Sequence, residues 1–233
     1  MLTRPAVFVT GTDTDAGKSF ITAALVRGLI EAGLDAAALK PVSCGRGIGE
    51  LNADVAALLA AQGMAANRAG DINLYDFAPF AAPMFAAPPG DGVDVAKLAA
   101  WCGQRVAGHA LTLIEGVGGL MVPLAEGVLV ADWLQMLAGA KVLLVVRARL
   151  GGINQALLSI DKLERMGCAP DWVVVNAADA QGNAMLDDHC AAISPYFAES
   201  TTLLQMPFSP DAGEAGRNIK DNPLFAALEA MMM

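Results

Sequence analysis

The sequence predicts an α/β fold with a mostly parallel sheet and helices on both of its faces. Short apolar runs alternate along the chain with segments of helical periodicity, and strands joined by crossover helices form parallel sheets. The composition agrees, because 55% of the 233 residues are hydrophobic and only 17% are charged, which provides a large buried core. We expect residues 1–233 to form a single domain, since no repeat or compositional boundary divides the chain.

The individual elements follow from the apolar patterning. Strands are predicted at 5–10, 35–40, 109–115, 141–147 and 171–176, and helices at 18–32, 52–61, 94–107 and 151–166. Continuous apolar runs such as PAVFVT, KVLLVVR and DWVVVN are typical of strands that are buried on both faces. The first helix carries Ile21, Leu25 and Leu29 on one face and stops at Gly33, and Asn52 is the expected cap of the second helix.

Residues 71–92 interrupt this alternation. They are rich in proline and aromatic residues (DINLYDFAPFAAPMFAAPPGDG), so an irregular excursion over the sheet edge is predicted. We expect Phe77, Phe80 and Phe85 to be buried there.

The charge and the cysteines exclude several classes of protein. A net charge of −9 argues against a nucleic-acid partner, which needs a basic face. The first residues contain too short an apolar run for a signal peptide, and no apolar stretch reaches the length of a membrane span. The four cysteines form no Cys-x-x-Cys pair, which disfavours a zinc site and a disulfide framework. These features together predict a cytoplasmic protein.

The first predicted strand runs directly into GTDTDAGKS, residues 11–19, and a helix follows, which is the context that a phosphate-binding loop requires. Backbone N–H groups and the helix N-terminus would surround an anion, and Gly17 lets the backbone approach the phosphates. Lys18 would reach the β- and γ-phosphates, and the Ser19 hydroxyl would ligate magnesium. Five residues separate the two glycines, one more than in the standard pattern, so Gly11 is displaced. The sequence therefore predicts a P-loop NTPase-like fold that binds a nucleoside triphosphate; the alternative is a glycine turn with an incidental lysine.

Two charged residues are expected at the same edge of the sheet, and a third lies near the start of a predicted helix. Lys40 and Glu115 end two predicted strands, and the carboxyl ends of parallel strands face the ligand crevice. Lys40 is either a phosphate-side cation or a surface lysine, since a buried cation needs an anionic partner. Glu115 is placed like the acid that supports magnesium. Asp54 is either a third magnesium ligand or only a helix-dipole partner.

Taken together, these segments resemble the dethiobiotin synthetase family. The resemblance runs through GTDTDAGKS (11–19), KPVSCG (40–45), NADVAALL (52–59), EGVGGLMVPL (115–124), ADW (131–133), RLGGINQALL (149–158) and VVVNA (173–177). It covers most of the chain in the family's order, including the nine-residue variant of the loop. It implies an ATP- and magnesium-dependent ligase that forms a cyclic urea from 7,8-diaminononanoate and carbon dioxide, through a carbamate and a carbamic-phosphoric anhydride.

The resemblance also implies the site residues. It gives catalytic roles to Lys18, Lys40 and Thr14, nucleotide contacts to Asp13, Thr14, Asp15, Ala16, Gly17, Lys18, Ser19, Phe20, Asn176 and Pro207, magnesium contacts to Ser19, Asp54 and Glu115, and substrate contacts to Lys40, Cys44, Gly118, Gly151 and Asn154. In the family, the segment with Gly151 and Asn154 comes from the neighbouring subunit and binds the substrate carboxylate at a helix N-terminus, which implies a homodimer with shared sites. For Asn154, a simple helix-cap role is the alternative.

The chain departs from the family pattern at two positions of the site. Cys44 stands where a serine is frequent, and a thiol is a weaker hydrogen-bond donor, although the neighbouring Ser43 can compensate. Asp15 replaces a frequent glutamate and reaches one methylene less far.

Three alternative hypotheses for the function were weighed against this resemblance. Cobyrinate or cobyric acid amidotransferase synthetases share the ATP-driven activation of a carboxylate but normally carry a glutaminase domain, for which this chain has no room. ATPase switches of the ParA/MinD type carry an additional lysine early in the loop, which is absent from TDTDA here. A degenerate module without catalysis is disfavoured by the retention of Lys18, Ser19, Lys40 and Glu115.

Overall fold

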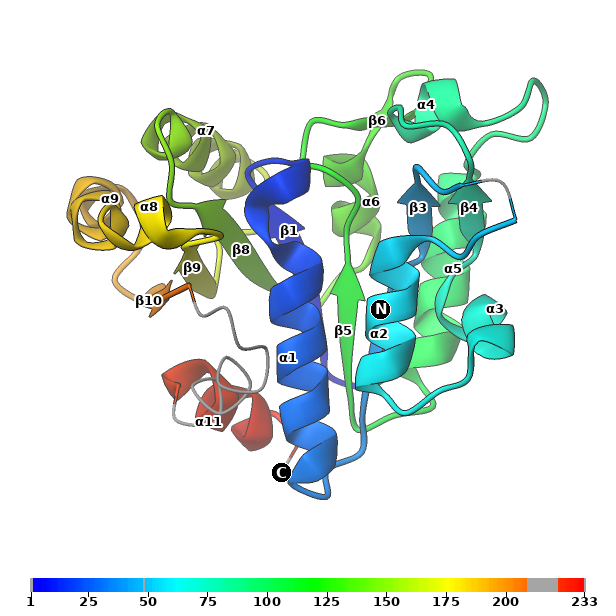
Figure 1. The fold of residues 1–233 in the computed structure, drawn as a ribbon, viewed down its shortest axis with the longest axis horizontal. Coiled ribbons are helices and arrows are strands. Elements are labelled where there is room, and N and C mark those ends of the chain that lie inside the picture. The colour runs from blue at the N-terminus through cyan, green and yellow to red at the C-terminus, as the bar shows by residue number, and fades with distance from the viewer. Residues whose placement is uncertain (1, 48, 209–221, 233) are drawn as a thin grey trace.

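A parallel sheet runs through the centre of the protein, and its strand order is β10-β9-β8-β1-β5-β2 (Figure 1). The computed structural model describes residues 2–47, 49–208 and 222–232. The strands of this sheet are β1 (Ala6–Gly11), β2 (Ala36–Leu39), β5 (Leu111–Glu115), β8 (Lys141–Arg147), β9 (Trp172–Asn176) and β10 (Thr202–Met206). Each neighbouring pair is parallel, which confirms the predicted fold class.

Helices and two small sheets complete the described part of the chain. The helices are α1 (Lys18–Glu31), α2 (Ala53–Ala61), α3 (Ala69–Ile72), α4 (Pro83–Ala86), α5 (Val95–Val106), α6 (Val130–Met136), α7 (Gly152–Arg165), α8 (Ala180–Asn183), α9 (Leu186–Ile193) and α11 (Pro223–Ala230), with 3₁₀ turns at Thr14–Ala16, Ala66–Arg68 and Ser194–Tyr196. The small sheets pair β3 (Val42–Cys44) with β4 (Tyr75–Phe77) in parallel, and β6 (Pro123–Ala125) with β7 (Val128–Leu129) antiparallel. None of the helices in the described ranges is long and apolar enough to cross a membrane.

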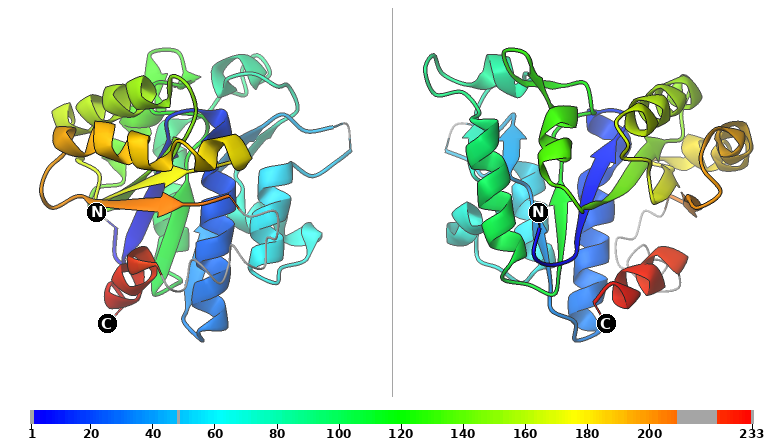
Figure 2. Two further views of the ribbon diagram at one scale, coloured as in Figure 1. Left: turned by 60° about the vertical axis from the view of Figure 1, so that its left-hand side comes forward. Right: turned by 180° about the vertical axis from the view of Figure 1, so that it is seen from behind.

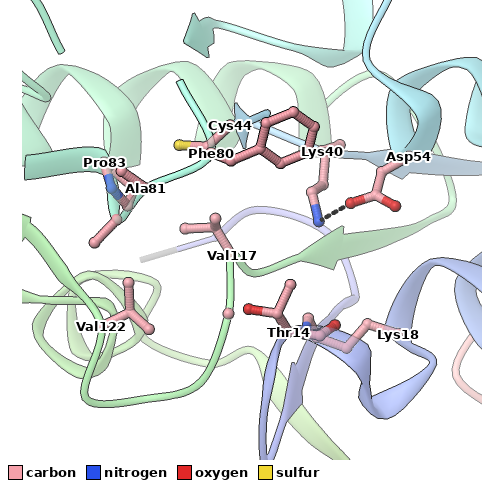
Figure 3. A pocket seen from close by; sticks show the side chains of 12 residues that line it. Thr14, Lys18, Lys40, Cys44, Asp54, Phe80, Ala81, Pro83, Val117 and Val122 are labelled. Carbon is pink, nitrogen blue, oxygen red and sulfur yellow. Dashed lines mark hydrogen bonds and ion pairs between the residues drawn. The ribbon is translucent and has the colours of Figure 1, made fainter. Parts of the chain in front are cut away.

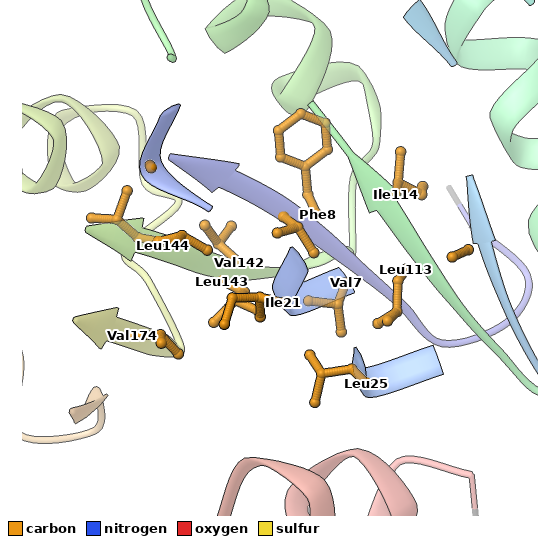
Figure 4. Packing of buried hydrophobic residues seen from close by; sticks show 14 of the residues in the cluster. Val7, Phe8, Ile21, Leu25, Leu113, Ile114, Val142, Leu143, Leu144 and Val174 are labelled. Carbon is orange, nitrogen blue, oxygen red and sulfur yellow. The ribbon is translucent and has the colours of Figure 1, made fainter. Parts of the chain in front are cut away.

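The helices cover both faces of the central sheet. α1 crosses the face that is turned toward the viewer in Figure 1, and α5 and α6 lie on the opposite face, which Figure 2 shows from behind. The predicted apolar face of α1 is confirmed, because Ile21, Leu25 and Leu29 are fully buried. Figure 4 shows Ile21 and Leu25 against side chains of β1, β5 and β8. The predicted Asn52 cap is also confirmed, since its side chain accepts hydrogen bonds from two backbone N–H groups at the start of α2.

The strand register gathers the predicted site at one edge of the sheet. Val9 of β1 aligns with Glu115, and Arg147 at the end of β8 aligns with Asn176 at the end of β9. All these strands run in the same direction, so the loops that leave their carboxyl ends converge. The phosphate loop after β1 lies in the middle of that edge.

The predicted burial of the aromatic residues in 71–92 is correct for only one of the three. Phe77 is buried within β4, whereas Phe80 is 89% exposed and Phe85 is 71% exposed. The reason lies in the local fold: β4 pairs with β3 and ends at Phe77, so the chain beyond it leaves the core and forms the short helix α4. Aromatic content alone did not distinguish a core residue from one on the outer side of this loop.

Candidate active site

In the phosphate loop, Gly17 connects the 3₁₀ turn Thr14–Ala16 to α1. This glycine has a φ of 99°, which favours glycine, and a Cβ added to it would lie 2.1 Å from Asn176 Nδ2. The Asn176 amide donates to the carbonyl of Ala16 at 3.0 Å, so the end of β9 fixes the loop from the side. The group that lies close to Gly17 in the structure is Asn176, and the close approach of the phosphates to this glycine stays a prediction.

Lys18 points back into the loop. Its ammonium donates to the carbonyl of Asp13 at 2.7 Å and to that of Thr14 at 3.2 Å. Burial, reinforced by the positive charge of Lys40, lowers the pKa of Lys18 from 10.5 to about 8. An anion beside this ammonium would relieve both effects, as expected of a phosphate-binding lysine.

A cluster of buried charges lies next to the loop. The Lys40 ammonium contacts Glu115 Oε1 at 2.5 Å and Asp54 Oδ2 at 3.0 Å, and the Ser19 hydroxyl donates to the same Glu115 oxygen at 2.6 Å. Lys40 and Glu115 are almost completely buried, whereas the Asp54 side chain is 45% exposed. The structure thus brings the four residues together and favours the phosphate-side reading of Lys40 over that of a surface lysine.

The charges in this cluster set each other's protonation. Burial lowers the pKa of Lys40, but the two carboxylates outweigh it, so the pKa of Lys40 is raised overall. Burial likewise acts to raise the pKa of Asp54, but the Lys40 charge outweighs it, so the pKa of Asp54 is lowered overall. An ammonium therefore lies between two carboxylates.

The oxygen atoms of the cluster fit a magnesium ion. Carboxylates and hydroxyls are the hard oxygen ligands that magnesium prefers, and Ser19, Asp54 and Glu115 supply both kinds. The second carboxylate oxygen of Glu115, Oε2, is buried and has no hydrogen-bond partner, so it is free to act as a metal ligand. In the described ranges, no group of three or more His, Cys, Asp or Glu side chains could hold a metal ion, so any metal site here would need the Ser19 hydroxyl or a nucleotide as well.

A cavity of about 400 Å³ opens beside the phosphate loop (Figure 3). Its lining residues are Thr14, Lys18, Lys40, Cys44, Asp54, Phe80, Ala81, Ala82, Pro83, Val117, Gly118 and Val122. Figure 3 shows Lys18, Lys40 and Asp54 at one end, and Ala81, Pro83 and Val122 at the other. Gly118 has a φ of 59°, and a Cβ on it would lie 2.6 Å from the Val122 side chain, so any other residue would be strained and would crowd this wall.

The thiol of Cys44 faces the same cavity. Burial raises its pKa to about 11, so it stays protonated at neutral pH and can act only as a weak donor. The neighbouring Ser43 is fully buried and donates to Asp76 at 2.8 Å. Ser43 is therefore already engaged elsewhere, and the expectation that it compensates for Cys44 is not supported.

A second, smaller cavity lies on the other side of the loop. It measures about 210 Å³ and is lined by Gly17, Phe20, Asn176, Ala177, Ala178, Pro207 and Phe208. The structure thus brings together three residues that were assigned to the nucleotide from distant parts of the sequence, Phe20, Asn176 and Pro207. The ring of Phe208 was not predicted, because only its neighbour Pro207 carried a signal.

Gly151 and Asn154 lie apart from the 400 Å³ cavity. Gly151 caps α7 with a φ of 85°, and both residues are exposed. Asp13 and Asp15 belong to the loop but do not line that cavity. Two arginines that the sequence analysis missed contact them: Arg149 Nη2 donates to Asp13 at 2.7 Å, and Arg147 Nη1 donates to the carbonyl of Asp15 at 3.3 Å. The available signal was the Arg-x-Arg pattern of Arg147 and Arg149 at the end of a predicted strand.

Comparisons with known proteins agree with this geometry. A family model described as an AAA domain matches residues 5–215. The ATP-dependent dethiobiotin synthetase BioD of Anaeromyxobacter dehalogenans (strain 2CP-C) is 35% identical over 212 residues, which cover 91% of this chain and 93% of that protein. The ATP-dependent dethiobiotin synthetase BioD of Pseudomonas aeruginosa (strain UCBPP-PA14) is 40% identical over 195 residues, which cover 82% of this chain and 84% of that protein.

Solved structures support the fold alone. The hydrogenase maturation factor HypB from Archaeoglobus fulgidus superposes with a TM-score of 0.57 at 14% identity, covering 99% of this chain and 91% of that one. The signal recognition particle receptor FtsY from Elizabethkingia anophelis gives a TM-score of 0.53 at 15% identity, covering 93% of this chain and 65% of that one. The sequence matches have a much higher identity than these structures and cover most of both chains. The chain therefore belongs to the ATP-dependent dethiobiotin synthetase family.

Proposed function

We propose that this chain is an ATP- and magnesium-dependent ligase of biotin biosynthesis that converts 7,8-diaminononanoate and carbon dioxide to dethiobiotin. The observation that carries the proposal is the 400 Å³ cavity, in which Thr14 and Lys18 of the phosphate loop face Lys40 and Asp54. The names of the relatives support the same reaction. In this proposal, residues 1–233 act as one cytoplasmic domain.

The reaction has three balanced steps. One amine of the substrate attacks carbon dioxide, a C–N bond forms, and a proton is released to give a carbamate anion. A carbamate oxygen then attacks the γ-phosphorus of ATP, and ADP leaves, which gives a carbamic-phosphoric anhydride. The second amine attacks the carbonyl carbon of the anhydride, a second C–N bond closes the ring, the C–O bond to the phosphate breaks, and inorganic phosphate and the proton of the amine leave.

Each step concentrates negative charge near the two lysines. Lys18 would release the carbonyls that it now contacts and bind the β- and γ-phosphates, and Lys40 would stabilise the carbamate and the transferring phosphoryl group. Thr14 would donate its hydroxyl to the carbamate or to a phosphate oxygen. The reaction needs little covalent participation by the protein, so positioning and electrostatics dominate.

Magnesium would be held by Ser19, Asp54 and Glu115. When bound, it would supply positive charge to the phosphate oxygens. Support comes from the open Oε2 of Glu115 and the all-oxygen donor set. Because the Lys40 ammonium now lies between Asp54 and Glu115, it would have to leave at least one of them to reach the carbamate. The base of the nucleotide would occupy the apolar cavity between Phe20, Asn176 and Pro207.

The substrate carboxylate would be bound by a second copy of the chain. Gly151 and Asn154 begin α7, whose N-terminus attracts anions, and they are exposed rather than turned into their own cavity. Leu150, just before α7, is 93% exposed, and Leu158, in the middle of α7, is 63% exposed; exposed apolar side chains of this kind suit a subunit interface. We therefore infer a homodimer in which α7 of one subunit completes the site of the other.

The reaction is tested by mixing the protein with 7,8-diaminononanoate, bicarbonate, ATP and magnesium, and by measuring dethiobiotin and ADP by mass spectrometry. Equal amounts of dethiobiotin and ADP are expected. ATP hydrolysis without dethiobiotin would retain the phosphate loop's role but contradict the substrate assignment.

Site sharing is tested by mixing two inactive variants. Lys18→Ala removes the phosphate lysine, and Asn154→Asp places a negative charge against the substrate carboxylate. If α7 serves the neighbouring site, an equimolar mixture after subunit exchange regains about a quarter of the sites, because each mixed dimer contains one intact site. No recovery in mixtures shown to have exchanged would contradict the shared site.

A further inference from the structure

Two arginines at the carboxyl end of β8 hold the phosphate loop, although the reaction assigns neither of them a role. Arg147 reaches the carbonyl of Asp15 at 3.3 Å, and Arg149 pairs with the carboxylate of Asp13 at 2.7 Å. Residues 141–145 of β8 pair with β1, the strand that leads into the loop. The loop is therefore fastened to the strand beside it by long cationic side chains.

Asp13 is the residue through which this attachment acts on the loop. Its Oδ1 accepts from the backbone N–H of Thr14 at 2.7 Å, and its carbonyl accepts from the Lys18 ammonium at 2.7 Å. Arg149 holds the other carboxylate oxygen, Oδ2. One aspartate thus connects Arg149 to the loop backbone and to the lysine that awaits the phosphates.

Arg149 is in turn held by the β8–α7 junction. Its carbonyl accepts from the backbone N–H of Gly152 at 2.9 Å and lies 3.0 Å from the Nε2 atom of His189. Its guanidinium also reaches Gln155 Oε1 at 3.4 Å. These contacts fix the arginine at the start of α7, so the anchor of the loop is part of the rigid sheet-to-helix connection.

We propose that Arg149 is a positioning residue for the nucleotide, and that it acts through the Asp13 carboxylate by keeping the phosphate loop ordered before ATP arrives. The inference rests on the proposed binding of ATP at this loop. A loop that is already ordered loses less conformational entropy when the ligand binds, and the ligand therefore binds more tightly. The ion pair is partly exposed, with 42% of the Arg149 side chain and 44% of the Asp13 side chain accessible, so a moderate effect is expected.

Arg149 could instead act directly, as a cation that attracts the triphosphate. A double-mutant cycle separates the two mechanisms. If the arginine acts through Asp13, its removal matters only while the aspartate is present. If it acts on the phosphates directly, its removal weakens ATP binding equally in either background, and Asp13→Asn alone strengthens binding because it removes a negative charge.

The test measures ATP dissociation constants with magnesium by calorimetry for the full chain, Arg149→Ala, Asp13→Asn, the double variant and Arg149→Lys. Arg149→Ala is expected to weaken ATP binding by about three- to tenfold, and Arg149→Lys by less, because it keeps a cation for Asp13. In the Asp13→Asn background, Arg149→Ala is expected to change the constant by less than about twofold. Arg165→Ala is the matched control, since it removes an arginine from the far end of α7 that pairs on the surface with Asp161.

Equal losses in both backgrounds, or no loss with Arg149→Ala, would overturn the inference. Failure of the unaltered protein to bind ATP would instead contradict the proposed function. Melting temperatures are measured in parallel, so a variant that is merely unfolded is recognised, and Arg149→Lys then supplies the comparison.

Discussion

The two ends of the 400 Å³ cavity beside the phosphate loop differ in polarity and burial. At the phosphate end, Lys40 and Glu115 are almost completely buried and contact each other at 2.5 Å. At the other end lie the apolar side chains of Ala81, Pro83 and Val122, and the ring of Phe80, from the same irregular loop as Ala81, is 89% exposed. Figure 3 shows the two ends facing one another across Val117.

The difference follows from the free energy of an unpaired buried charge compared with that of an apolar side chain exposed to water. A buried charge without a partner is very unfavourable, so the buried ammonium of Lys40 must be paired with carboxylates before any ligand binds. An apolar side chain in water costs only about 25 cal/mol per Å². The apolar end can therefore stay open and be covered by the methylene chain of the substrate. Variants at the polar end should affect chemistry and folding, whereas variants at the apolar end should affect only substrate affinity.

Lys18→Ala should produce the largest loss. It removes the cation that we propose binds the β- and γ-phosphates, so kcat/KM for ATP is expected to fall by about 10³-fold or more. Steady-state ADP release measures this directly. Lys141→Ala is the control, because Lys141 begins β8 at the opposite edge of the sheet and pairs with Asp171 near the surface. A loss smaller than tenfold would show that the loop does not bind the phosphates in the proposed way.

Lys40→Met should separate turnover from nucleotide binding. Turnover is expected to fall by about 10²- to 10³-fold because the variant removes the cation that we propose stabilises the carbamate, while the ATP dissociation constant stays within about threefold. Unchanged turnover would contradict the proposed carbamate site.

The same variant tests the pairing inside the charge cluster. Removing one partner of a buried ion pair typically costs about 3–5 kcal/mol, because Glu115 is then left without its cation. We expect a lower melting temperature that millimolar magnesium restores in part, and a smaller effect of magnesium on the unaltered protein. Lys141→Met is the matched control, and equal responses of all three proteins would contradict the role of Lys40 as the cation of this cluster.

The pH dependence of ATP binding should report the state of Lys18. Its pKa is lowered to about 8 by burial and by Lys40, against 10.5 in the unfolded chain. Above about pH 8 the free enzyme loses the Lys18 ammonium, so if that group binds phosphate as proposed, the ATP dissociation constant is expected to rise by up to tenfold per pH unit. In the same window the unfolded chain still holds the proton that the folded protein has released, so the contribution of Lys18 to stability increases with pH from about 8 to 10.5.

Calorimetric titrations between about pH 7 and 9.5 measure this effect. Lys18→Arg serves as the comparison, because a guanidinium stays charged throughout that range. The variant should show a flat profile above pH 8, whatever its absolute affinity. A flat profile for the unaltered protein as well would show that Lys18 is not the group that titrates.

The elements that the sequence predicted well are those specified by local patterns. Buried strands such as β8 and β9 are continuous apolar runs, and the phosphate loop is a contiguous motif between a strand and a helix. The edge strand β10 (Thr202–Met206) was missed because one side of it is exposed and it contains the polar Gln205. Edge strands carry a weaker signal because they need not be apolar throughout.

Contacts between residues that are distant in the sequence limited how much of the site could be predicted. The strand-end rule placed Lys40 and Glu115 at one edge of the sheet, but it did not reveal that they pair with each other, which depends on strand register and side-chain reach. The contact between Asp13 and Arg149 joins two separate sequence segments, 136 positions apart, and neither segment shows that the two side chains meet. Residues 71–92 were the weakest prediction, since apolar content does not say whether a side chain faces the core or awaits a ligand.

Phe80→Ala should have the smallest effect and tests that last distinction. The ring lines the cavity and lies against the backbone of Gly45, where an added Cβ would be 2.5 Å from it, so its position is defined although it is exposed. If the substrate's methylene chain covers this ring, its loss removes about 1 kcal/mol of apolar contact, and the KM for the diamine rises about fivefold with kcat and the KM for ATP unchanged. Phe85→Ala is the control, because Phe85 is 71% exposed but is not among the residues that line the cavity. Equal changes for the two variants would mean that the exposed rings act on the loop as a whole, and that the apolar end of the cavity is not where the substrate chain lies.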